Sequence, residues 1–189
     1  EMAENLKAAG LAVTIVELQD HVIAPLDFEM AADVGQYLEG QGIRLVLGRG
    51  VTALEPRDTG LRVILDEGQL DTDMLILSVG VRPEAALARQ AGLELTERGA
   101  IVTDSHMRTS APDIYAVGDA VQVRDFVTGD SAYVPLAGPA NKQGRIAADN
   151  ICGIPSEYAG TQGSAVVKLF DMTVAVTGMN ERTVKAKGI

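Results

Sequence analysis

The sequence is poor in residues on which several classes of protein depend. Only one of its 189 residues is cysteine (Cys152) and two are histidine, so an internal disulfide framework and a metal site made of cysteines alone are excluded. Aromatic residues make up 4% of the chain and tryptophan is absent, which argues against an aromatic platform for nucleic-acid bases. The 26 acidic residues outnumber the 16 basic ones, giving a net charge of -10. We therefore expect no polyanion such as DNA as a partner.

Long apolar runs and targeting signals are also lacking. No apolar stretch reaches the roughly 18 residues that a membrane-spanning helix needs. The acidic start Glu1-Met2-Ala3-Glu4 is unlike the basic first region of a signal peptide. These absences predict a cytoplasmic protein without membrane contact, in which the lone cysteine is a structural thiol. The apolar fraction of 47% is ordinary for a globular protein.

Helices and strands are expected to alternate in the first 80 residues. Apolar positions at helical spacing predict a helix over residues 1–9, ended by Gly10. The β-branched run at residues 12–16 predicts a buried strand. A helix over residues 28–39, capped by Asp27, is expected next. The other strands expected here are residues 43–47, 51–55, 61–65 and a central strand over 74–79.

The pattern changes after residue 80. A short helix is expected over residues 84–91, followed by loops and an apolar strand at residues 114–117. A longer helix is expected to begin at Gly138-Pro139 and to run to about Ile151. The remaining expected elements are strands at residues 164–170 and 173–177 and a last helix capped by Asn180.

An acidic residue, Glu17, ends the first expected strand. In a dinucleotide-binding βαβ unit, such a carboxylate binds the adenosine ribose about 20 residues after a glycine-rich loop. Glu17 lies sixteen positions after Glu1, so that loop would lie just upstream of Glu1. Leu18 and Gln19 offer no positive charge to a 2′-phosphate, which favours NADH over NADPH. A solvated acid at a strand end explains the same residue, and both interpretations stay open.

Two motifs in the second half indicate another nucleotide site. The segment "TSAPDIYAVGDAV" contains Gly118, which permits a close approach to its backbone, and Asp119, whose oxygens suit a polyol such as the ribityl chain of a flavin. In "YVPLAGPANKQGRIAADNI" the amides near Leu136, Ala137 and Ala140 would lie at a helix N-terminus. Its partial positive charge would stabilise negative charge on a reduced flavin. An N-capping aspartate and an ordinary capped helix are the alternatives.

In six segments the sequence resembles the FAD-dependent pyridine nucleotide–disulfide oxidoreductases. Within that family it is most similar to the branch of coenzyme A-disulfide reductases, NADH oxidases and persulfide reductases. The resemblance implies an α/β fold with an incomplete Rossmann-like NAD domain (residues 1–80), the second half of an FAD domain (81–158) and the start of an α+β dimerisation domain (159–189). The segments that carry it are "EMAENL", "VTIVE", "SVGVRPE", "MRTSAPDIYAVGDA", "YVPLAGPANKQGRIAADNI" and "GTQGSAVVKLFDMTVAVTGMNERTVKAKGI".

The resemblance also implies roles for residues on the NAD side. Glu1 matches a family glutamate near the nicotinamide, and Glu17 matches the ribose-binding acid. Gly80 lies in the family's "GxRP" segment, which closes over the NAD.

On the flavin side, Asp119, which follows Gly118, matches the ligand of the ribityl chain. Leu136, Ala137 and Ala140 match the segment that lies against the isoalloxazine ring.

Parts of the family pattern are missing from these 189 residues. Neither glycine-rich phosphate loop occurs, and no residue matches the redox cysteine. We therefore expect a fragment that lacks the N-terminal part of a homodimeric flavoenzyme and is inactive alone, with no catalytic residue and no metal. The parent would pass hydride from NADH to FAD, and electrons on to a cysteine-linked disulfide, persulfide or oxygen acceptor.

Two other functions remain as alternatives. One is a non-catalytic module that self-associates. Loss of the central first strand would leave unpaired backbone on its two neighbours and invite a strand-exchanged oligomer. The other is a simple dehydrogenase, against which Gly118-Asp119 and the following helix argue because they fit a second nucleotide site.

Overall fold

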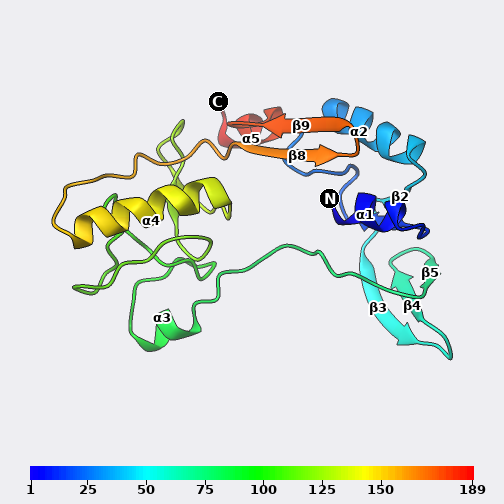
Figure 1. Ribbon diagram of the computed structural model, residues 1–189, viewed down its shortest axis with the longest axis horizontal. Coiled ribbons are helices and arrows are strands. Elements are labelled where there is room, and N and C mark those ends of the chain that lie inside the picture. The colour runs from blue at the N-terminus through cyan, green and yellow to red at the C-terminus, as the bar shows by residue number, and fades with distance from the viewer. The chain divides into compact units, whose positions relative to one another are not determined.

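The computed structural model describes residues 1–189, which form two compact units (Figure 1). Unit 1 comprises residues 1–78 and 166–189, and unit 2 comprises residues 79–165. No helix has the length and apolar character that a bilayer crossing requires. The division into three domains that the resemblance implies stays a prediction.

Unit 1 begins with the expected alternation of helices and strands. The elements are α1 (Met2–Ala8), β1 (Thr14–Glu17), α2 (Phe28–Gly40) and β2 (Arg44–Leu47). The strands β1 and β2 pair in parallel, with Ile15 opposite Leu45 and Val16 opposite Val46. Helix α2 connects them and buries Ala31, Val34 and Leu38 on one face, as its apolar spacing predicts.

An antiparallel sheet follows in the same unit. It has the order β3 (Val51–Pro56), β4 (Leu61–Leu65) and β5 (Gln69–Thr72), and β5 was not predicted. The turn between β3 and β4 requires Gly60, whose φ is +77° and whose hypothetical Cβ would lie 2.3 Å from the Thr72 carbonyl oxygen.

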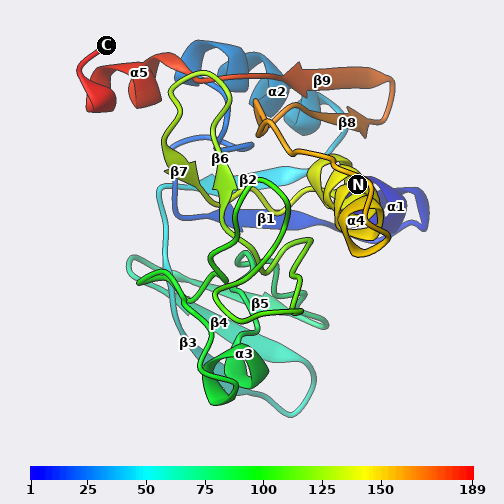
Figure 2. The same ribbon diagram turned by 90° about the vertical axis from the view of Figure 1, so that its left-hand side faces the viewer.

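The C-terminal segment shares a core with this first part of the chain. Strands β8 (Ala165–Leu169) and β9 (Met172–Val176) pair with each other, and α5 (Glu181–Lys187) follows. Both views show β8 and β9 beside α2 (Figures 1 and 2). The residues buried in their shared core are Val22, Leu26, Ala31, Val34, Leu38, Ile43 and Leu169.

Unit 2 has little regular structure apart from one long helix. Its elements are α3 (Ala86–Gln90), the short pair β6 (Val123–Arg124) and β7 (Ser131–Ala132), and α4 (Ala137–Ile151). The face of α4 formed by Pro139, Gln143 and Ala147 is buried. The core residues of unit 2 are Met107, Val121, Val123, Ala147 and Tyr158.

Two predicted strands are wrong. Residues 74–79 are extended but pair with no strand, and Leu77 and Val79 are 66% and 90% exposed. Residues 114–117 make only a single bridge, between Tyr115 and Arg108. An apolar β-branched run favours an extended backbone, but a strand also needs a neighbour that accepts and donates its hydrogen bonds over several residues. Residues 74–79 have no such neighbour, and residues 114–117 exchange only two backbone hydrogen bonds with residues 107–109.

Candidate functional site

Glu17 ends β1 at the carboxyl edge of the parallel pair, where α/β sheets bind ligands. Its side chain is half-buried, and its Oε1 accepts a hydrogen bond from the Gln19 backbone nitrogen at 2.9 Å. Its carbonyl oxygen accepts from the Arg49 amide at 3.1 Å. Within residues 1–189, Oε2 accepts no hydrogen bond. The carboxylate is therefore held in place with one oxygen free for a hydroxyl donor.

The other two residues predicted on the NAD side are less constrained. Glu1 is exposed and precedes α1, and its carbonyl oxygen accepts from the Asn5 side-chain amide at 2.8 Å. Gly80 has a φ of +88°, and a Cβ there would meet nothing within 4 Å. Glu1 and Glu17 belong to unit 1, whereas Gly80 belongs to unit 2.

The loop that carries Asp119 is fastened to α4 by a buried side chain. The Gly118 amide donates to Oε1 of Gln143 over 2.7 Å, and Gln143 is completely buried. Gly118 has a φ of +87°, with open space where a Cβ would stand. The Asp119 carboxylate is exposed and has no hydrogen bond within the 189 residues. Sequence reasoning missed Gln143, although its spacing on the face of Pro139 and Ala147 was a usable signal.

Gln143 also lies next to a buried hydroxyl. Burial raises the pKa of Tyr158, and the nearby Gln143 and Thr161 side chains partly offset that rise. Neither Nε2 of Gln143 nor the Tyr158 hydroxyl makes a hydrogen bond of good geometry. The strong contact of Gln143 is therefore the one to Gly118.

The N-terminus of α4 offers fewer free amides than expected. Leu136 is the N-cap residue and has no capping side chain. Its own amide donates to the Val134 carbonyl at 2.9 Å, and the Ala140 amide donates to the Leu136 carbonyl at 3.2 Å. The first-turn amides of Ala137 and Gly138 have no intrahelical acceptor. Of the three predicted positions, only Ala137 thus presents a free N–H group.

These features of unit 2 are compatible with a flavin. The carboxylate of Asp119 has unused acceptors for ribityl hydroxyls, and the backbone at Gly118 is open to close approach. The helix N-terminus at Ala137 is uncapped and can face a group that gains negative charge. The residues present therefore fit FAD, although they supply only some of its contacts.

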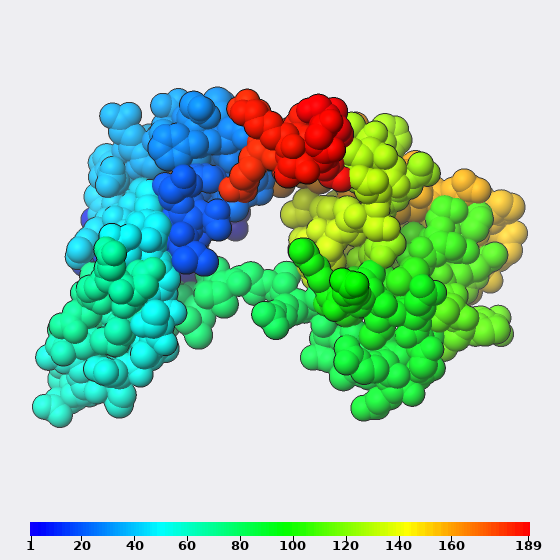
Figure 3. Space-filling view, turned by 180° about the vertical axis from the view of Figure 1, so that it is seen from behind, coloured from blue at the N-terminus to red at the C-terminus, as the bar shows by residue number.

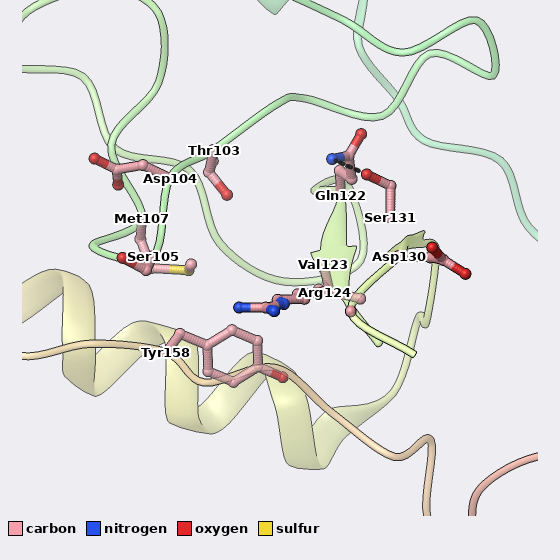
Figure 4. A pocket seen from close by; sticks show the side chains of 11 residues that line it. Thr103, Asp104, Ser105, Met107, Gln122, Val123, Arg124, Asp130, Ser131 and Tyr158 are labelled. Carbon is pink, nitrogen blue, oxygen red and sulfur yellow. Dashed lines mark hydrogen bonds between the residues drawn. The ribbon is translucent and has the colours of Figure 1, made fainter. Parts of the chain in front are cut away.

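Pockets in unit 2 lie elsewhere than at Asp119. One of about 340 Å³ is lined by Thr103, Arg124 and Tyr158 among others, and Gln122 donates to Ser131 beside it at 2.8 Å (Figure 4). Another, of about 400 Å³, includes Gly138 and Pro139, next to Ala137. Neither contains Gly118 or Asp119. No group of three or more His, Cys, Asp or Glu side chains in residues 1–189 is arranged for a metal ion.

The family assignment comes from the comparison with known proteins. The sequence profile of the pyridine nucleotide-disulphide oxidoreductases matches residues 1–144. The chain belongs to this family. The match includes Glu17, Gly80, Gly118 and Asp119, and it extends to the second turn of α4.

Individual relatives place the chain in one branch of the family. It is 37% identical to an NADH oxidase of Methanocaldococcus jannaschii, over 100% of this chain and 42% of the relative. It is 48% identical to reduced CoADR-RHD of Bacillus anthracis, with a TM-score of 0.94 over 100% of this chain and 34% of that one. The chain thus spans 42% and 34% of the lengths of these two proteins, which is less than half of each.

A third relative has an altered dinucleotide specificity. This is an engineered water-forming NADPH oxidase bound to NADPH, a mutant of the Lactobacillus brevis NADH oxidase, 33% identical to this chain. Its TM-score is 0.94, over 100% of this chain and 42% of that one. Three of its five substitutions change an aspartate and the two residues after it to alanine, arginine and serine.

Proposed function

We propose that this chain is part of a cytoplasmic flavoprotein that passes hydride from NADH to FAD, and electrons on to a cysteine-linked disulfide, persulfide or oxygen acceptor. The observation that carries the proposal is the family match over residues 1–144, which spans both candidate nucleotide sites in one chain. The proposal is also supported by relatives that are NADH oxidases and a CoADR.

In this proposal Glu17 binds the adenosine ribose of NADH. Its Oε1 is fixed by the Gln19 amide at 2.9 Å, so the carboxylate is pre-oriented and loses little freedom on binding. Glu1 would lie near the nicotinamide, and Gly80 would let the segment around it approach the dinucleotide closely. In this proposal Glu1 and Glu17 orient the hydride donor.

Asp119 would hold the ribityl chain of FAD, with Gly118 and Gln143 fixing its backbone. Bound FAD would supply the redox chemistry, as cofactors do in such enzymes. Leu136, Ala137 and Ala140 would line the isoalloxazine ring. The free amide at Ala137 would lower the energy of negative charge on that ring, because a helix N-terminus carries partial positive charge.

Two variants of the full-length protein test these roles separately. Glu17→Gln is expected to raise KM for NADH by about 10- to 150-fold, since a hydrogen bond to a charged group contributes about 1.5–3 kcal/mol, while flavin content stays unchanged. Asp119→Ala is expected to lose flavin, while the apoprotein stays folded. Loss of flavin in Glu17→Gln, or full flavin occupancy in Asp119→Ala, would contradict the assignment.

Self-association is the second candidate function, and one observation favours it. The parallel pair of β1 and β2 has only two strands, and residues 74–81 expose several large apolar side chains: Met74, Ile76, Leu77, Val79 and Val81. Unpaired strand edges and exposed apolar segments promote strand exchange. A homodimer or strand-exchanged oligomer would appear in size-exclusion chromatography with light scattering, and a monodisperse monomer would contradict this candidate.

A further inference from the structure

Arg182 brings a positive charge to the segment that follows Glu17. Its guanidinium donates to the Ala24 carbonyl oxygen at 3.0 Å and to Oε1 of Gln19 at 3.4 Å. In Figure 3 the red atoms of α5 lie against the blue atoms of this early segment. A cation therefore contacts the residue two positions after the acid that we propose to bind ribose.

The position of Arg182 is set by the hydrogen bonds at the start of α5. The Asp27 carboxylate accepts from the backbone amides of Glu181 and Arg182, at 3.0 and 3.4 Å. The Asn180 side chain donates to the Pro25 carbonyl at 3.2 Å. Because these contacts join α5 to residues 25–27, the Arg182 side chain projects along the loop after β1.

The charge of Arg182 is not neutralised by an ion pair. Its two side-chain acceptors are neutral oxygens. The carboxylate of Glu181 instead pairs with Lys185 at 2.5 Å, and that of Asp20 pairs with His21 at 2.5 Å. A guanidinium has five N–H donors, so Arg182 keeps donors for a further ligand.

We propose that Arg182 binds the adenosine 2′-phosphate of NADPH, so that the dinucleotide site accepts NADPH as well as NADH. This rests on the proposed role of Glu17. Arginine is suited to the task because its planar fork matches phosphate oxygens, and an arginine near the ribose-binding acid accommodates the 2′-phosphate in such sites. Leu18 and Gln19 carry no charge. The positive charge that binds the 2′-phosphate therefore comes from Arg182, which lies 163 positions after Gln19 in the sequence.

The test uses the full-length, FAD-loaded protein and four variants. Arg182→Ala removes the side chain, Arg182→Gln keeps hydrogen-bond donors without the charge, and Arg182→Lys keeps the charge. Lys185→Ala, which removes one positive charge from the same helix, is the matched control. For each protein, kcat/KM is measured with NADPH and with NADH, and calorimetry compares binding of adenosine 2′,5′-bisphosphate with binding of ADP, which has no 2′-phosphate.

Arg182→Ala and Arg182→Gln are expected to lower kcat/KM for NADPH about 10- to 100-fold and to change that for NADH less than about twofold. Binding of adenosine 2′,5′-bisphosphate should weaken by a similar factor and binding of ADP should not change. Arg182→Lys should recover part of the loss, and Lys185→Ala should match the wild type.

Equal losses for both dinucleotides would overturn the proposal, because they would mean that Arg182 only supports the fold. A wild-type protein that oxidises NADH but neither turns over NADPH nor binds adenosine 2′,5′-bisphosphate more tightly than ADP would also overturn it. A flavin-loaded wild type that oxidises neither dinucleotide would instead refute the proposed function, and this inference with it.

Discussion

Replacing Gln143 by leucine is expected to weaken FAD binding without a direct contact to the cofactor being lost. Leucine is of similar size but has no acceptor, so the Gly118 amide loses the hydrogen bond that it now makes over 2.7 Å. Gln143 is completely buried, so leucine at this position would place a side chain without an acceptor against the partly buried Gly118 amide. A buried donor left without an acceptor costs about 1–3 kcal/mol.

The lost hydrogen bond would destabilise the loop conformation that presents Asp119 to the cofactor. If the loop is released in the apoprotein and must be ordered again on binding, the Kd for FAD rises by about 5- to 150-fold. The assay is a flavin fluorescence titration of apoprotein prepared from the full-length protein, with thermal unfolding measured in parallel. The unfolding measurement separates a loosened loop from a general loss of stability.

Gln122→Leu is the matched control for Gln143→Leu. Gln122 belongs to the same unit and donates to the Ser131 hydroxyl at 2.8 Å on the surface, where water can replace the lost bond. Its effect on stability should stay within about 0.5 kcal/mol, with FAD affinity unchanged. Equal FAD affinity in Gln143→Leu and the wild type would refute the argument that Gln143 positions the loop.

The remaining predictions concern stability and the isolated chain. Gly118→Ala should cost about 1–2 kcal/mol because of its positive φ alone, whereas Gly160→Ala should cost more in thermal unfolding because its Cβ would lie 2.5 Å from a carbonyl oxygen; equal costs would contradict this. Arg62 and Arg57 lower the pKa of the Asp71 carboxyl from 3.8 to about 2. The ionised carboxylate therefore stabilises the folded state above about pH 4, and this stabilisation is lost as the pH falls toward 2. Asp71→Asn should flatten acid unfolding in that range, and an unchanged profile would contradict the ion pair's role. The purified 189-residue chain should bind FAD and NADH with Kd values of about 1 μM or weaker, because it has no glycine-rich phosphate loop. A sub-micromolar Kd for either cofactor in a titration would contradict this.

Helices were predictable because their signals are local. The cap at Asn180 is confirmed by its acceptance of the Thr183 amide at 2.9 Å. Asp27 does precede α2 as predicted, but its carboxylate makes no cap bond there. It binds the amides at the start of α5 instead. Sequence spacing gives the position of a cap residue but not the competition from a distant helix for its oxygens.

The strands and the site depended on contacts that local patterns do not contain. Residues 74–79 have strand composition but no partner strand. Gly118 and Asp119 could be proposed as site residues from the sequence because glycine and aspartate have distinct chemistry at a loop, and their role stays a prediction. Arg182 was missed because its contact with Gln19 joins residues 163 positions apart, and Gln143 was missed because a buried amide looks like any polar helix residue until its acceptor role is seen.

The most direct test of the account is anaerobic reduction of the full-length protein by NADH, followed by its visible absorption. We propose an FAD site at Asp119 and a dinucleotide site at Glu17 in one protein. We therefore expect a yellow protein whose flavin absorbance bleaches when NADH is added, and an Asp119→Ala variant that purifies without flavin. A colourless protein, or a bound flavin that NADH does not reduce, would contradict it.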